Sequence, residues 1–167
     1  PVGGITLSAP TQANMKITIE GHATHAGLAP EKGISAIVAA SKAIAKMKLG
    51  RLDEETTANV GVIQGGRAGN IVPDTVVIKA EARSRNESKL DAQIAHMVNL
   101  FEEEAKAIGA KATVEISKEF KAFQWSSEDS VVKMAAKACK KIGIPVVLQQ
   151  GGGGSDANVF NAIGLPA

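Results

Sequence analysis

The sequence predicts an α+β protein in which a ferredoxin-like β-α-β-β-α-β unit is inserted into part of an α/β domain. Strict alternation of apolar and polar residues marks strands at 14–22, 75–83 and 112–120. Stretches of helical periodicity lie between these strands. The flanking segments at 1–11 and 119–167 carry an α/β pattern of their own, which indicates two pieces of a second domain.

The elements of the inserted unit, residues 12–118, follow in order. In the first strand Met15, Ile17 and Ile19 are expected to face a core. After a loop ending at Gly33, a helix is predicted from the apolar positions Ile34, Ile37, Val38, Ile44 and Met47. Strands are predicted at 59–66 and 75–83, with Val76, Ile78, Ala80 and Ala82 facing inward. A long helix follows Asn86 and stops at Gly109, and its core face is Leu90, Ile94, Met97, Val98, Phe101, Ala105 and Ile108. This order predicts a four-stranded antiparallel sheet with both helices on one face.

The second domain is expected to consist of residues 1–11 and 119–167. An amphipathic helix is predicted at 128–142, followed by a short buried strand at 145–150. A glycine-rich loop at 151–156 then leads into another helix. A further strand is expected beyond the final residues.

Composition excludes several classes of function. A net charge of +2 without a basic stripe gives no case for nucleic-acid binding. No apolar run approaches the roughly 20 residues of a membrane span. The single Cys139 excludes an internal disulfide and predicts a cytoplasmic location.

Two histidines three residues apart, in "GHATHAG" at 21–27, raise the question of a metal site. On a strand, His22 and His25 would point to opposite faces, and no third ligand is nearby. No metal site is therefore predicted here. His22 is expected to be a solvated strand residue. His25 lies in a loop that can project into a cleft, although a solvated loop histidine is the alternative.

The segment "GGGGSDAN" offers backbone N–H groups at the start of a helix, which suits an anion or a carbonyl oxygen. It also approximates a nucleophile elbow around Ser155, but no histidine follows that serine as a hydrolase triad needs. A serine hydrolase stays open as one alternative, and a simple capping role for Asp156 as another. The segment "GGRAGNIVPD" can be read as a hairpin loop, and Glu102-Glu103-Glu104 as surface charge.

Four segments, "HAGLAPEKGISAI", "GGRAGNIVPD", "EARS" and "GGGGSDANVFNAIGLP", together resemble the dinuclear zinc exopeptidases related to peptidase T, carboxypeptidase G and the aminoacylases. The peptidase T-like aminopeptidases are the nearest likeness. The resemblance implies that residues 12–118 are a lid or dimerisation domain set into a catalytic domain.

The resemblance also implies roles for individual residues. His25 corresponds to a lid histidine that reaches across a dimer and stabilises the oxyanion at the partner's metal centre. The residues that the resemblance places in substrate binding are Asn70, Arg83, Gly153, Ser155, Asp156 and Asn158. An ion pair with Glu81 is the alternative for Arg83. Many relatives carry arginine at position 158, so asparagine favours an aminopeptidase or deacylase over a carboxypeptidase.

The family's metal ligands are not recognisable in this sequence. The resemblance therefore implies a segment of a cytoplasmic, homodimeric enzyme that uses two zinc ions, bound outside this chain, to hydrolyse short peptides. We expect this chain alone to bind no zinc at a built site and to be inactive. A related deacylase or carboxypeptidase, and a non-enzymatic ferredoxin-like dimerisation or ligand-binding module, are the alternatives.

Overall fold

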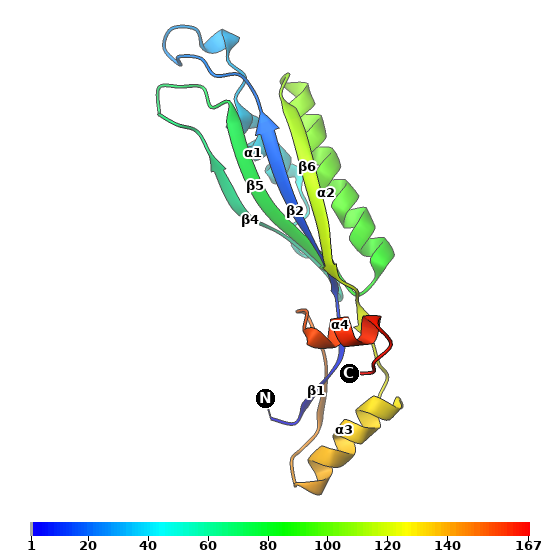
Figure 1. Ribbon diagram of the computed structural model, residues 1–167. Coiled ribbons are helices and arrows are strands. Elements are labelled where there is room, and N and C mark those ends of the chain that lie inside the picture. Colours follow the sequence, from blue (N-terminus) through cyan, green and yellow to red (C-terminus); the bar gives the residue numbers. More distant parts are fainter. Residues whose placement is uncertain (1) are drawn as a thin grey trace.

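This computed structural model describes residues 2–167. It contains two β-sheets of unequal size, and the chain crosses between them twice (Figure 1). The strands and helices are β1 (Gly4–Ala9), β2 (Thr11–Glu20), a 3-10 turn (Pro30–Lys32), α1 (Ala36–Lys46), β3 (Gly50–Arg51), β4 (Thr56–Gly65), β5 (Thr75–Ser84), α2 (Glu87–Ala107), β6 (Lys111–Phe120), β7 (Phe123–Gln124), α3 (Ser130–Lys141), β8 (Val147–Gln150) and α4 (Asp156–Ala162). We call residues 11–120 the larger unit, and residues 2–10 with 121–167 the smaller unit.

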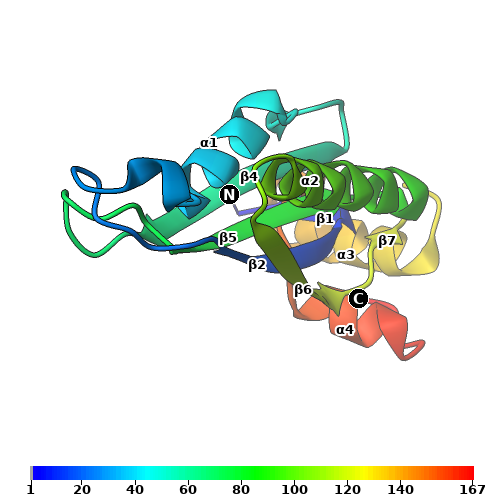
Figure 2. The same cartoon turned by 90° about the horizontal axis from the view of Figure 1, so that it is seen from above.

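The larger unit is an antiparallel sheet with the strand order β3-β4-β5-β2-β6. Its helices α1 and α2 lie on the same face (Figure 2). The order β4-β5-β2-β6 of the long strands is that of a split β-α-β ferredoxin-like unit, so the predicted fold is confirmed. The two-residue strand β3, which pairs with the start of β4, was not predicted.

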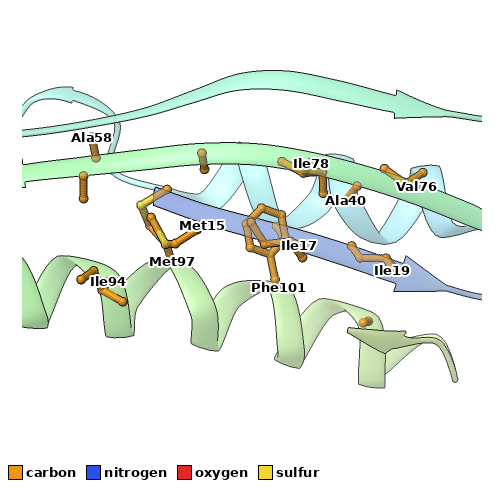
Figure 3. Close-up of a cluster of buried hydrophobic side chains, with 14 of the residues drawn as sticks. Met15, Ile17, Ile19, Ala40, Ala58, Val76, Ile78, Ile94, Met97 and Phe101 are labelled. Carbon is orange, nitrogen blue, oxygen red and sulfur yellow. The ribbon is translucent and has the colours of Figure 1, made fainter. Parts of the chain in front are cut away.

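The core lies between this sheet and its two helices (Figure 3). The inward positions predicted for β2 and β5 are all buried, because alternate residues of a strand point to opposite faces. In α2, Leu90, Met97 and Phe101 are fully buried, as predicted. Asn86 caps this helix by accepting a hydrogen bond from Lys89 N at 3.1 Å, and Gly109 ends it with a φ of 81°.

The buried face of α1 differs from the prediction. Four small residues, Ala36, Ala39, Ala40 and Ala43, face the core, whereas Ile37 and Val38 are 38% and 44% exposed. Small side chains let α1 lie close to the sheet and to α2, so periodicity of large apolar residues identified the helix but not its inner face. Of the predicted inner positions, Ile44 and Met47 do pack against the core, whereas the prediction was wrong for Ile37 and Val38.

Glu104 is a second correction. It was interpreted as surface charge, but it is only 8% exposed and forms an ion pair with Lys46 of α1. The helix α1 covers that side of α2, so a position that looks solvent-facing in an isolated helix becomes an interhelical contact.

The smaller unit has the strand order β7-β1-β8. Strand β1 pairs in parallel with β8 and antiparallel with β7, so segments from both ends of the chain share one sheet. The strand predicted at 145–150 was expected to be buried, yet Val147 and Leu148 of β8 are 50% and 42% exposed. Consecutive residues of a strand point to opposite faces, so within residues 2–167 neither face of β8 is fully covered, although Leu148 shares a pocket with residues of α3. In residues 2–167, no helix combines the length and the apolar character needed to cross a bilayer.

Candidate functional site

His25 and Asn70 belong to two loops that lie side by side at one end of the larger sheet. Ala26 N donates a hydrogen bond to Asn70 O at 2.9 Å, and His25 forms a β-bridge with Ile71. Val72 N donates to Thr24 O, also at 2.9 Å. The structure therefore brings together two residues that stand 45 positions apart in the sequence. We call them the distal pair.

Glycines at 21 and 33 allow this close approach. A Cβ atom on Gly21 would collide with the carbonyl oxygen of Ile34, and one on Gly33 would collide with Thr24 and Val72. No larger residue could take these places without moving the neighbouring loop. Gly21 and Gly33 thus set the position of the histidine loop.

The His25 ring is exposed and held by its own loop. Its Nδ1 accepts a hydrogen bond from Gly27 N at 3.1 Å. An accepting Nδ1 carries no proton, so the neutral ring bears its hydrogen on Nε2. Among residues 2–167 no hydrogen bond occupies Nε2, so in this exposed residue the Nε2–H is available as a donor.

His22 does not share this arrangement. Strand β2 ends at Glu20, two residues earlier than predicted, because the chain turns to pair His22 with Ile34 through two backbone hydrogen bonds of 2.9 Å. Across residues 2–167, no group of three His, Cys, Asp or Glu side chains could hold a metal ion. The resemblance places the zinc ligands outside this chain, and His22 and His25 form no ligand set of their own.

The glycine-rich loop lies at the other end of the larger unit, where the chain crosses between the sheets. Its glycines divide into two kinds. A Cβ atom on Gly151 would collide with Ser8 O, and one on Gly154 would collide with the ring of Phe120, whereas a Cβ atom on Gly152 would meet open space. The outer two glycines therefore permit packing, and the inner two face outward.

Ser155 and Asp156 are exposed at the start of α4. In the described residues the Ser155 hydroxyl has no hydrogen bond to a histidine, which gives the nucleophile-elbow alternative no support. Asn158 is different, because it is only 1% exposed. Its Oδ1 accepts from Ser155 N at 2.9 Å, and its Nδ2 donates to two backbone carbonyls.

Arg83 stands on the outer face of β5, beside this loop. Two hydrogen bonds, of 3.1 and 2.9 Å, join its guanidinium to Glu81, and this pair is half-buried. One of its terminal nitrogens lies 4.0 Å from the place a Cβ atom on Gly153 would occupy. Arg83 is thus ion-paired and also adjacent to the loop, so both roles considered for it are geometrically possible. We call Arg83 and residues 151–156 the hinge group.

Arg85 is a residue that sequence reasoning missed. Its guanidinium donates to Gly151 O at 3.5 Å and to Glu54 O at 3.1 Å, which connects the glycine-rich loop to the turn before β4. A cavity of about 350 Å³ lies there, lined in part by Arg51, Arg83 and Arg85. Arg85 follows the last residue of β5 and stands two positions after Arg83, and continuation of the strand alternation is the signal that could have placed both on one side.

The turn beside this cavity holds a carboxylate, Asp53, whose pKa is lowered. The backbone N–H of Glu55 and the Lys89 ammonium hydrogen-bond the Asp53 carboxylate and lower its pKa to about 2. Lys89 also contacts Glu55 at 2.7 Å, and these two acids raise the pKa of the lysine. The cluster fixes the turn that Arg85 contacts.

The distal pair and the hinge group occupy opposite ends of the same sheet. In the β2–β5 ladder, Thr11 pairs with Ser84 near the hinge group, and Glu20 pairs with Thr75 near the distal pair. Nine residue steps of about 3.4 Å separate these ends, which gives about 30 Å. Within one chain, His25 cannot reach the glycine-rich loop.

Residues 9–109 match the protein family described as "Peptidase dimerisation domain". The structure is similar to that of the aminopeptidase PepT from Bacillus cereus, with 52% sequence identity and a TM-score of 0.93 over 99% of this chain. It is also similar to that of a tripeptidase from Staphylococcus aureus, with 41% identity and a TM-score of 0.94 over 99% of this chain. Among curated proteins, YqjE of Bacillus subtilis is 53% identical over 165 residues. This chain spans 44% of the length of each of the three relatives.

Proposed function

The chain belongs to the peptidase dimerisation domain family, and on that premise we propose that it is a segment of a peptidase T-like aminopeptidase that hydrolyses short peptides. Residues 12–118, which make up nearly all of the larger unit, are the lid and dimerisation domain. Residues 1–11 and 119–167 are parts of the catalytic domain into which it is inserted. When bound, two zinc ions would supply an activated water and a polarised carbonyl, and their ligands would come from outside this chain.

The observation that carries this proposal is the separation of about 30 Å between the distal pair and the hinge group. Neither group is a complete site. If two copies associate with opposed lids, His25 and Asn70 of one copy can complete the site that contains Arg83 and the glycine-rich loop of the other. This arrangement accounts for the placement of both groups on one lid.

A surface suited to such an association lies along β4 and α1. Within residues 2–167, strand β3 pairs with Thr57 and Ala58 and no strand pairs with the outer edge of β4 from Asn59 to Gly65. Ile63, which pairs with the inward-facing Ile78, is on the helical side of that edge and is 48% exposed. The exposed Ile37 and Val38 of α1 lie on the same side of the sheet. An open edge beside apolar side chains favours two-fold pairing with a second copy.

A matched pair of substitutions tests the dimer in the full-length protein. We expect Ile63→Lys to shift the protein from dimer to monomer in sedimentation velocity. Ile116→Lys, at a position 49% exposed on the opposite edge strand β6, is expected to leave the dimer intact. Equal effects of the two variants would contradict the assignment of this edge.

His25 is proposed to stabilise the oxyanion of the reacting carbonyl. The Gly27 N–H holds its Nδ1, so the Nε2–H donor faces outward in the neutral ring. We expect His25→Ala to lower kcat about 100- to 1,000-fold in the zinc-loaded full-length protein, without loss of bound zinc. His22→Ala serves as the control and is expected to change kcat far less. A parallel fall in zinc content would identify His25 as a ligand instead.

Substrate contacts are proposed for Asn70, Arg83, Gly153, Ser155 and Asp156, each of which is exposed or faces outward. Asn158, which the resemblance also placed in substrate binding, is buried and bonded to backbone atoms, so no direct substrate contact is proposed for it. Comparing tripeptides with N-acyl amino acids and with carboxypeptidase substrates separates an aminopeptidase from a deacylase or carboxypeptidase.

Labelling of Ser155 by a fluorophosphonate would favour a serine hydrolase. Absence of turnover with every substrate in the presence of zinc would favour a non-enzymatic binding module.

A further inference from the structure

The chain crosses between the two sheets at two adjacent points. Pro10 separates β1 from β2, and Lys121 with Ala122 separates β6 from β7. The two crossings are bonded to each other, since Ala122 N donates to Thr11 Oγ1 at 2.8 Å. Any change in the orientation of the larger unit relative to the smaller unit must alter the backbone at these two points.

One buried side chain contacts both crossings. Asn158 Nδ2 donates to Pro10 O at 3.3 Å and to Lys121 O at 2.7 Å. Its Oδ1 accepts from Ser155 N at 2.9 Å, at the end of the glycine-rich loop. Both amide hydrogens of Asn158 are therefore donated to the crossings, and its oxygen accepts a hydrogen bond from the loop.

The glycine-rich loop packs against the same crossings at two further places. Gly151 N donates to Ser8 O at 2.8 Å, just before the first crossing. The ring of Phe120, just before the second crossing, occupies the space that a side chain at position 154 would need. Figure 1 shows α4, which carries Asn158, lying across the junction of the two units.

We propose that Asn158 is a positioning residue that couples the orientation of the lid to the glycine-rich loop. This inference rests on the proposed function for its consequence in catalysis, but the coupling itself is a property of the fold. Asparagine suits the position because it alone supplies two donors and one acceptor at this length. In Asn158→Asp, one carboxylate oxygen can still accept from Ser155 N. The second oxygen would then face the carbonyl oxygens of Pro10 and Lys121, to which it can donate nothing.

The test uses the full-length protein with spin labels on the two units, at the exposed positions Lys106 and Glu128, in a Cys139→Ser background. We expect Asn158→Asp to broaden the distribution of distances between the labels. Asn161→Asp, on the same helix, is the matched control, because its hydrogen bonds go to Ala167 and not to a crossing. It is expected to leave the distribution as in the wild type.

Steady-state kinetics on a tripeptide supply the second readout. We expect Asn158→Asp to raise KM and to lower kcat/KM about tenfold, because a displaced lid misplaces the groups that hold the substrate. A merely destabilised protein would lose active enzyme without a change in KM. Asn158→Ala, which removes the bonds without adding charge, takes the place of Asn158→Asp if that variant does not fold.

The results separate this inference from the proposed function. An unchanged distance distribution in Asn158→Asp or Asn158→Ala would overturn the coupling, and so would equal broadening in Asn161→Asp. If the wild-type protein had no peptidase activity, the proposed function would fail. The distance measurement would still decide the coupling.

Discussion

The larger and smaller units of this chain differ in how completely each buries its apolar side chains. Every buried member of the main hydrophobic cluster lies in the larger unit, between Ala13 and Ala105. In the smaller unit the buried apolar side chains are Ala9, Pro10 and Val132, while Met134, Ile142 and Ile163 are each more than 70% exposed. Burial of apolar surface is the dominant favourable term in folding, so the two units should differ in stability.

This difference teaches that a well-formed sheet is not by itself a stable unit. Strands β1 and β8 pair in parallel, with a register shift between Thr6 and Ser8, yet α3 buries only one side chain, Val132, and α4 buries only the polar Asn158. The smaller unit thus has hydrogen bonds without a matching core. The following predictions test that contrast in this 167-residue chain, from the largest expected effect to the smallest.

Removal of the largest core side chain should show the strongest effect. Phe101 is fully buried, and Phe101→Ala is expected to lower the free energy of unfolding of the larger unit by about 3–5 kcal/mol, because it leaves a cavity. Val132→Ala, in the smaller unit, is expected to cost about 1–2 kcal/mol at most. Denaturant titrations followed by circular dichroism check both values. A larger loss for Val132→Ala would reverse the comparison.

Hydrogen exchange should separate the two units within the unaltered chain. Amides of the central strands β2 and β5 are expected to exchange only through global unfolding, since helices and neighbouring strands cover them. Amides of β8 are expected to exchange at least about 100-fold faster through local opening, a gap of about 3 kcal/mol. Exchange read by NMR or mass spectrometry gives the ratio. Similar protection in both units would mean that the smaller sheet is as stable as the larger.

Helix caps offer a finer comparison. Asn86 accepts a bond from Lys89 N at the start of α2, whereas the Asp129 side chain accepts from Ser126 N and leaves the first turn of α3 uncapped. Asn86→Ala is expected to lower the free energy of unfolding by about 1 kcal/mol. Asp129→Ala should have less effect on the main unfolding transition, which belongs to the larger unit. Thermal unfolding of the two variants provides the check.

The smallest effect concerns pH. The pKa of Asp53 in the folded chain is about 2, below its ordinary value of 3.8, so the native state favours the ionised form. Its contribution to stability is therefore complete above pH 3.8 and is lost as the pH falls through about 2. We expect Asp53→Asn to flatten the acid limb of a plot of stability against pH in this range. An unchanged acid limb would show that other carboxylates account for it.

The sequence predicted the ferredoxin-like unit well because its strands and α2 carry clear local signals. Met15, Ile17 and Ile19 alternate with polar residues, and Asn86 and Gly109 mark the two ends of α2. Each of these patterns arises from the geometry of a single helix or strand, so the spacing of residues in the sequence is enough to identify it. For the candidate site, the motifs identified the loops of His25, Asn70 and residues 151–156. Their functional roles remain predictions.

Only the tertiary structure decided which surfaces meet. Local periodicity could not show that α1 packs through its alanines, nor that Glu104 is covered by Lys46, because both depend on a second helix. It also could not show that His25 and Asn70 share one end of the sheet while Arg83 lies at the other. Nor could it show that Asn158 joins Pro10 to Lys121, which are 111 residues apart in the chain. Contacts between residues distant in sequence are set by strand order and crossing points, and no periodicity within one segment encodes them.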